Sequence, residues 1–237
     1  MPLFERISLL RQYLKKQLWA YHSSRRYSAR QAAFQDSRSY WEERYKEGRT
    51  SGSGSYGKLK AFKAAVLNEF VQEHHVRSVI EFGCGDGNQL IGLSYPAYLG
   101  LDVSQTAVGK CQELFKDDET KKFKTVEEYN DEIAELSLSL DVIYHLVEDD
   151  VFENYMRALF MSSKRYVIIY SSNENIMRKN QGRHVRHRKF TDWIDSNIEE
   201  WRVLRKIEND FPYSGVAGEG SHADFYIYEK VNRRDSS

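Results

Sequence analysis

The feature that most constrains the fold is a short apolar run that ends in three alternating glycines. Residues 78–82 include β-branched and aromatic side chains, which is typical of a strand buried on both faces of a parallel sheet. Gly83, Gly85 and Gly87 follow, and glycine allows positive φ and a close approach of the backbone to a ligand. Residues 88–93 are predicted to form a helix whose first amide groups point at that ligand. The pattern therefore predicts a strand, a turn and a helix around a binding site.

A second apolar run, residues 98–101, ends in a carboxylate at Asp102. An acid at the end of the second strand can accept hydrogen bonds from both hydroxyls of a ribose. A dinucleotide fingerprint would need its third glycine at position 88, where the chain has Asn88, and Gly87 falls one residue early. The spacing therefore weakens the nicotinamide interpretation. The alternatives are another nucleoside ligand and a glycine turn that only reverses the chain.

The segment Glu81-Phe82-Gly83-Cys84-Gly85-Asp86-Gly87, taken with Asp102, resembles the class I S-adenosylmethionine-dependent methyltransferases. Their first motif is an acidic residue followed by G-x-G-x-G, and an acid ends their next strand. The resemblance covers residues 40–231 and implies an α/β fold with a Rossmann-like, seven-stranded sheet. That sheet is mostly parallel, has an antiparallel C-terminal edge hairpin and carries helices on both faces. S-adenosylmethionine is the implied cofactor, and the implied contacts are Tyr40, Tyr45, Glu81, Gly83, Cys84, Gly85, Gly87, Asp102, Val103, Glu128 and Leu140.

The composition bounds the class of protein. The chain has 237 residues with 35 basic and 35 acidic ones, so it fits one α/β domain with an extension, and its net charge does not favour nucleic acid. Its two cysteines, Cys84 and Cys111, provide neither a disulfide framework nor a metal-binding spacing. No apolar run reaches membrane-spanning length, and no signal peptide is recognisable. We therefore expect a cytoplasmic protein without a bound metal.

Residues 1–38 are predicted to form a basic amphipathic helical extension, followed by a methyltransferase domain at residues 39–231 and a disordered tail at 232–237. Apolar residues recur near helical spacing in the extension, with arginines and lysines between them. One interpretation is a helix that lies on an anionic membrane surface as a peripheral contact. The alternatives are a helix docked on its own domain or on a second copy in a homodimer.

An aromatic segment with Tyr40, Trp41 and Tyr45 precedes residues 48–57, which are rich in glycine and serine. Many class I methyltransferases carry a similar segment, and the resemblance implies a lid over the cofactor. Aromatic faces attract a sulfonium cation, and glycines allow a loop to open and close. A plain linker is the alternative.

The turn after the fourth strand holds the candidate catalytic groups. In an open parallel sheet the ligand crevice lies outside the carboxyl ends of the strands, so Asp141, Tyr144 and His145 should face it. His145 is predicted to be the general base, Asp141 to orient either His145 or the substrate, and Tyr144 to contact the substrate. The alternatives are a neutral histidine packed on the next helix, and a metal bound by His145 with the acidic residues 148–150. Further strands are expected at residues 121–126, 135–140, 165–170, 201–207 and 223–230, and helices at 58–74, 104–115, 152–161 and 190–198.

A basic run, residues 183–189, follows the fifth strand. Beside the crevice it could hold a phosphate or carboxylate of the substrate, and the predicted contacts are Arg183, Arg186, His187 and Arg188. The alternative is a solvated charged loop.

Together with the resemblance, these residues predict an S-adenosylmethionine-dependent enzyme that methylates a hydroxyl of a small molecule, a sugar or a glycan. A hydroxyl acceptor needs a base to remove its proton, which is the role assigned to His145. Residues 139–142 lack the Asn-Pro-Pro-Tyr type of motif expected for amide or adenine amino methylation. Two alternatives stay open: a cofactor-binding scaffold without transfer activity, and an RNA methyltransferase. The neutral net charge and the lack of a recognisable RNA-binding module make a nucleic-acid partner the weaker choice.

Overall fold

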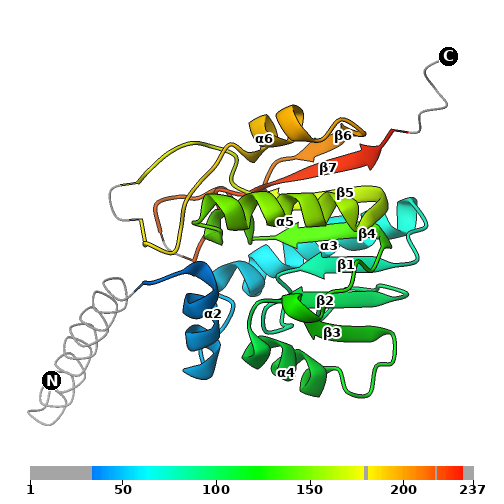
Figure 1. Ribbon diagram of the computed structural model, residues 1–237, viewed down its shortest axis with the longest axis horizontal. Coiled ribbons are helices and arrows are strands. Elements are labelled where there is room, and N and C mark those ends of the chain that lie inside the picture. Colours follow the sequence, from blue (N-terminus) through cyan, green and yellow to red (C-terminus); the bar gives the residue numbers. More distant parts are fainter. Residues whose placement is uncertain (1–33, 179–180, 217, 232–237) are drawn as a thin grey trace, which may run out of the picture.

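A seven-stranded sheet organises the described chain, which in this computed structural model comprises residues 34–178, 181–216 and 218–231. The strands lie in the order β3-β2-β1-β4-β5-β7-β6 (Figure 1). Their bounds are β1 (Val79–Phe82), β2 (Tyr98–Asp102), β3 (Lys121–Thr125), β4 (Ala134–Leu140), β5 (Ser163–Ser171), β6 (Trp201–Ile207) and β7 (Asp224–Lys230). The first five are parallel, and β7 runs antiparallel between β5 and β6. This confirms the predicted sheet, with its antiparallel pair at the C-terminal edge.

Helices cover both faces of the sheet (Figure 1). The helices of the described chain are α2 (Ser37–Lys46), α3 (Gly57–Glu73), α4 (Gln105–Leu114), α5 (Asp149–Met161) and α6 (Phe190–Asn197), of which α3 to α6 pack on the two faces. Short 3-10 turns are η1 (Ser53–Ser55), η2 (Val126–Glu128) and η3 (Ile143–His145). α3 and α4 contribute to one buried apolar cluster, and α5 and α6 contribute to a second. The sheet is therefore covered on both faces, as predicted.

Strand β5 shows why an apolar run becomes a central strand here. Val167 and Ile169 belong to the cluster under α5 and α6, whereas Ile168 and Tyr170 belong to the cluster under α3 and α4. All four side chains are fully buried. Successive side chains of a strand point to opposite faces, so a strand covered on both sides needs apolar residues at consecutive positions.

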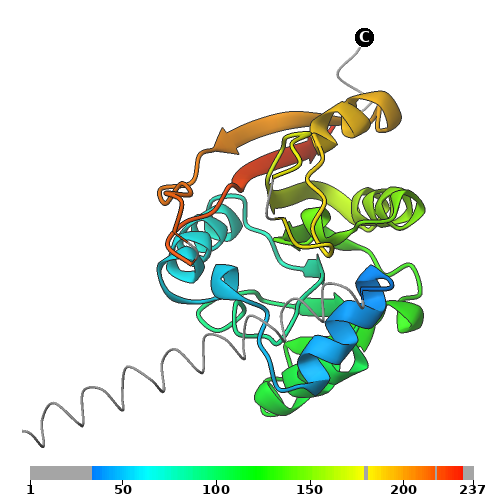
Figure 2. The same ribbon diagram turned by 90° about the vertical axis from the view of Figure 1, so that its left-hand side faces the viewer.

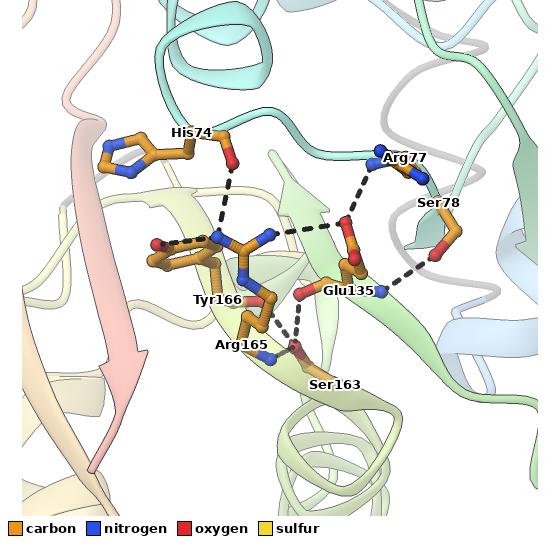
Figure 3. A network of polar contacts seen from close by, with 7 residues as sticks. All are labelled: His74, Arg77, Ser78, Glu135, Ser163, Arg165 and Tyr166. Atoms are coloured by element: carbon orange, nitrogen blue, oxygen red, sulfur yellow. Dashed lines mark hydrogen bonds and ion pairs between the residues drawn. The ribbon is translucent and has the colours of Figure 1, made fainter. Parts of the chain in front are cut away.

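A polar network ties the amino ends of the central strands together (Figure 3). The Arg165 guanidinium donates to the His74 carbonyl at 3.2 Å and lies 3.5 Å from the Glu135 carboxylate. That carboxylate also accepts the backbone N–H of Arg77 at 2.8 Å, and the Ser163 hydroxyl donates to the Glu135 carbonyl at 3.1 Å. The network joins the end of α3 to β4 and β5 at the edge opposite the carboxyl ends of the strands.

The helix predicted at residues 88–93 is wrong. Residues 84–93 form consecutive turns, in which the N–H of Leu90 bonds to the carbonyl of Gly87 and the N–H of Leu93 bonds to the carbonyl of Leu90. Gly92 has φ +96°, a value outside the helical region, and Pro96 follows closely. Only a few residues separate the glycine turn from Gly92, and a segment of this length is too short for a stable α-helix.

Both predicted terminal segments fall mainly outside the described residues. The extension at 1–38 shares only its last five positions with the described chain, and the tail at 232–237 shares none. Membrane or homodimer contacts of the extension therefore stay predictions. Within the described ranges, no helix combines the length and the apolar character that crossing a bilayer requires.

Candidate functional site

A cavity of about 400 Å³ lies at the carboxyl ends of the parallel strands. Strand β1 has β2 on one side and β4 on the other, so the strand order reverses at β1. Open α/β sheets bind ligands at such a switch point. α2 lies across this edge and faces the viewer in Figure 2. The cavity volume falls within the roughly 300–1,000 Å³ of pockets that bury small organic ligands. The predicted site residues that line it are Tyr45, Glu81, Gly83, Cys84, Gly85, Asp102, Val103, Leu140, Asp141 and His145.

Asp102 ends β2 with its carboxylate held by backbone amides. The side chain is 6% exposed. Its Oδ2 accepts the N–H of Gly85 and its Oδ1 accepts the N–H of Ser104, both at 2.9 Å. Burial raises the pKa of Asp102 to about 6, although these hydrogen bonds favour the ionised form. Each carboxylate oxygen has a second lone pair, so both can still accept a ligand hydroxyl.

The glycine turn is as tight as its sequence predicts. Gly83 has φ +89° and Gly85 has φ +60°, a region that L side chains rarely adopt. A Cβ on Gly85 would lie 2.4 Å from the Ser51 Oγ, and a Cβ on Gly83 would lie 2.4 Å from a methyl group of Val142. These two glycines therefore let the loop after α2 and the loop after β4 close directly on the turn.

Cys84 lies between these glycines and lines the cavity. A hydrogen bond with Cys111 and burial both raise the pKa of the Cys84 thiol. A neutral thiol is a weak nucleophile, so Cys84 serves the turn as a small buried residue.

A polar cluster lines another part of the cavity. Lys63, on α3, is 1% exposed, and its Nζ lies 2.5 Å from the Asp141 Oδ2. Burial raises the pKa of Glu81 to about 7, against a hydrogen bond from Tyr98 at 2.6 Å and the charge of Lys63. Gln89 is 5% exposed, and its Oε1 has no hydrogen-bond partner among the described residues. The cluster thus presents an ammonium, carboxylates and an unused amide oxygen.

Sequence analysis missed Lys63, although a signal existed. The apolar stripe of α3 includes Leu59, Leu67 and Phe70, and Lys63 occupies the stripe position one turn after Leu59. A lysine on the buried face of a helix needs a partner, because burying an unpaired ammonium is very costly. Its carboxylate partner comes from the far end of β4, which no local pattern identifies.

His145 lines the cavity as the last residue of η3. Its Nδ1 lies 3.0 Å from the His184 carbonyl oxygen, and a carbonyl can only accept, so Nδ1 carries the proton and Nε2 is the acceptor. The His184 ring stacks on it at 5.5 Å, and Trp41 meets it edge-on at 4.8 Å. Burial lowers the pKa of His145 to about 4, against the charge of Asp141. The ring is therefore neutral at pH 7.

The predicted orientation of His145 by Asp141 is wrong. The Asp141 carboxylate instead binds Lys63 and accepts the Tyr144 hydroxyl at 2.8 Å, while the His184 carbonyl holds the imidazole. Asp141 has φ +61°, in the left-handed region, at the point where the chain leaves β4. Its predicted contact with the substrate stays a prediction.

Helix α2 contributes Trp41 and Tyr45 to the cavity lining, as a lid would. Tyr40 lies outside the lining and stacks on His184 at 4.2 Å. Outside the lining as well, the Glu42 carboxylate accepts the Ser104 hydroxyl at 2.5 Å. Burial opposes ionisation of Glu42, but this and further hydrogen bonds lower its pKa to about 2. α2 is thus attached to the loop that also positions Asp102.

The basic run does not face the cavity. Arg188 is 8% exposed and binds the Leu146 and Val147 carbonyls, and both Arg186 and Arg188 bind Asp149. Both guanidinium groups are therefore engaged within the fold and away from the cavity lining, and the anion-binding role of Arg186 and Arg188 stays a prediction. His187 is hydrogen-bonded to a serine after β5, at 2.6 Å.

Other predicted residues also lie away from the cavity. The Glu128 carboxylate accepts the N–H and the hydroxyl of Thr125 at 2.8 and 2.9 Å, so it caps η2. A Cβ on Gly87 would meet the Cys111 Sγ at 3.0 Å, so Gly87 allows α4 to pack closely. The predicted residues outside the lining are Tyr40, Gly87, Glu128, Tyr144, Arg183, Arg186, His187 and Arg188.

Across the described ranges, no group of three or more His, Cys, Asp or Glu side chains could hold a metal ion.

Comparison with known proteins supports the fold. No protein-family model matches the sequence, and no curated protein matches it. Among solved structures, the methyltransferase domain of bacterial CtHen1-C has a TM-score of 0.59 at 18% identity, over 74% of this chain and 100% of that one. Magnesium protoporphyrin IX methyltransferase from Synechocystis PCC 6803, with bound S-adenosylmethionine, has a TM-score of 0.59 at 13% identity, over 84% and 99%.

The N-methyltransferase NodS from Bradyrhizobium japonicum WM9, in complex with S-adenosylhomocysteine, has a TM-score of 0.56 at 14% identity, over 72% of this chain and 85% of that one. At such identities the likeness shows the fold alone.

Proposed function

We propose that this chain, whose fold is that of the class I S-adenosylmethionine-dependent methyltransferases, binds S-adenosylmethionine and methylates a hydroxyl of a small molecule, a sugar or a glycan. The observation that carries the proposal is the buried Asp102 carboxylate beside the glycine turn. It is set by two amides, retains acceptor capacity on both oxygens and faces a cavity of suitable volume.

The residues in the cavity fit the chemistry of this cofactor. Asp102 suits the ribose hydroxyls. Lys63, with Glu81 and the unused Oε1 of Gln89, offers a cation and acceptors to an amino-acid end that carries both charges. Trp41 and Tyr45 bring two aromatic side chains into the lining, and aromatic rings attract a sulfonium cation. When bound, the cofactor supplies a methyl group activated by a positively charged sulfur.

The chain itself has to align the acceptor, exclude water and remove a proton. α2 contributes Trp41 and Tyr45 to the cavity lining, and positioning of a bound acceptor supplies about 7–11 kcal/mol in well-oriented reactions. The Nε2 of His145 would accept the hydroxyl proton, while its Nδ1–H stays on the His184 carbonyl. The low pKa of His145 keeps this acceptor unprotonated at pH 7.

The RNA alternative drew on the basic residues of the extension at 1–38, which lie mainly outside the described residues, and on the basic run at 183–189. Two cations of that run, Arg186 and Arg188, are engaged with Asp149 and with backbone carbonyls, so the run offers phosphates less free charge than the sequence suggests. The scaffold alternative is decided by the activity test described next.

The test is transfer of labelled methyl from S-adenosylmethionine to a panel of hydroxyl acceptors, starting with monosaccharides and glycans. Asp102→Asn is the cofactor-site control, and Asp118→Asn, on the exposed loop before β3, is the matched control. The proposal expects a product with the methyl on oxygen, normal with Asp118→Asn and greatly reduced with Asp102→Asn. Cofactor binding without transfer to any acceptor would favour the scaffold, and methyl on nitrogen would refute O-methylation.

A further inference from the structure

Arg188 holds the turn that carries His145. Its guanidinium donates to the Leu146 carbonyl at 2.6 Å and to the Val147 carbonyl at 3.0 Å. It therefore binds the carbonyls of the two residues that directly follow His145. The same group donates to the Asp149 carboxylate at 2.8 Å. These bonds use the forked geometry of a guanidinium, which a lysine ammonium lacks.

Residues shortly before Arg188 in the chain contact the same turn, including the residue that precedes His145. The backbone N–H of Arg186 donates to the Tyr144 carbonyl at 2.8 Å, and its guanidinium donates to the Val147 carbonyl at 2.9 Å. Two positions earlier, the His184 carbonyl accepts the Nδ1–H of His145 at 3.0 Å. One segment, residues 184–188, therefore both holds the turn and orients the imidazole on it.

We propose that Arg188 is a positioning residue: it holds segment 184–188 on the turn after β4, so that the His184 carbonyl keeps His145 in one orientation and one tautomer. This inference rests on the proposed role of His145 as the base. Arg188 touches no cavity surface, so it acts through His184 and His145 and not on the substrate.

Helix α2 supports the same turn through Ser37. The Ser37 hydroxyl, at the start of α2, donates to the His145 carbonyl at 2.7 Å and accepts the N–H of Val147 at 3.2 Å. The Glu148 carboxylate accepts both the N–H and the hydroxyl of Ser37, at 2.9 and 2.6 Å. The carbonyls of residues 144–147 are thus all bound by α2 or by segment 184–188, which explains how an irregular turn can hold the His145 ring in place.

The local electrostatics make the position of His145 measurable. The charged and titratable groups around its ring are Asp141 and Tyr144 from its own turn, Arg44 from α2, and His184 and His187 from the segment. Burial lowers the pKa of His145 to about 4. A ring released from the His184 carbonyl would become hydrated, and its pKa would rise toward the ordinary value of about 6.5.

The variants for the test are Arg188→Met, which removes the fork, and Arg188→Lys, which keeps the charge. Lys189→Met is the matched control, because Lys189 pairs at the surface with Asp192 at 2.6 Å and leaves the 144–147 carbonyls untouched. The first readout is the imidazole ¹⁵N NMR spectrum of the free protein across pH, with the His145 signals assigned by His145→Gln. The second is kcat and KM for methyl transfer.

We expect wild type and Lys189→Met to share one Nδ1–H tautomer and a pKa near 4 for His145. Both Arg188 variants should show mixed tautomers and a raised pKa, and kcat should fall roughly tenfold to a hundredfold while KM for the cofactor is kept. An unchanged tautomer and pKa in Arg188→Met would overturn the proposal. If that variant does not fold, the NMR spectrum of Arg188→Lys decides in the same way.

The two readouts separate this inference from the proposed function. If His145→Gln kept full turnover, the base assignment would fall, but the NMR comparison would still decide whether Arg188 positions the ring. If the tautomer were unaffected and His145→Gln were inactive, the function would stand and the role of Arg188 would fall.

Discussion

The buried pair of Lys63 and Asp141 gives the sharpest stability prediction. Lys63→Met would leave the Asp141 carboxylate, which is 14% exposed, without its cation. Breaking a buried pair by removing one partner typically costs about 3–5 kcal/mol. Asp141 would keep its hydrogen bond from Tyr144 at 2.8 Å and its cavity exposure, so the lower end of that range applies. We expect the free energy of unfolding to fall by about 3 kcal/mol.

Urea denaturation followed by circular dichroism measures this loss of free energy. In thermal denaturation, the same loss should lower the melting temperature of a chain of this size by roughly 6–12 °C. Lys116→Met is the matched control, because Lys116 makes an exposed ion pair with Glu113 at 3.0 Å, and such pairs contribute about 0–1 kcal/mol. Adding Asp141→Asn to Lys63→Met should recover part of the stability, because no charge is then left unpaired. A loss below about 1 kcal/mol in Lys63→Met, equal to that of the control, would refute the reasoning.

Three further predictions concern the site. His145→Gln should keep cofactor affinity and lower turnover by roughly a hundredfold or more, and steady-state kinetics with full turnover would remove the base assignment. Because ligand hydroxyls donate to an ionised carboxylate, affinity for S-adenosylmethionine should fall as the pH drops below the Asp102 pKa of about 6. Calorimetry should find roughly tenfold weaker binding at pH 5 than at pH 7, and equal affinity would contradict this. Gly85→Ala places a Cβ 2.4 Å from the Ser51 Oγ at φ +60°, so it should weaken cofactor binding at least tenfold by calorimetry, whereas Gly109→Ala, which meets no atom within 4 Å, should not.

The sequence predicted the parts of the fold that depend on local pattern. A strand covered on both faces must be apolar at consecutive positions, so β1, β2 and β5 were recognisable, and the glycines and Asp102 follow directly from the ends of β1 and β2. The conformation of residues 88–93 was harder to predict. Their pattern is compatible with a helix, but Gly92 and Pro96 interrupt the segment before a stable helix can form.

The partners of charged side chains were beyond local reasoning. Arg188 meets the Leu146 carbonyl 42 residues earlier, and Lys63 meets Asp141 78 residues later. A basic run looks the same in sequence whether its guanidinium groups bind a substrate anion or the backbone of another loop. Only the packing of segment 184–188 on the turn after β4 distinguishes these roles.

The measurement that decides most directly is isothermal titration of S-adenosylmethionine and S-adenosylhomocysteine into wild-type protein, Asp102→Ala and the surface control Asp118→Ala. We expect wild type and Asp118→Ala to bind both ligands with about micromolar affinity, roughly 8 kcal/mol, and Asp102→Ala to lose this binding. Failure of the wild type to bind either ligand, or equal affinity in Asp102→Ala, would contradict a cofactor site at the glycine turn.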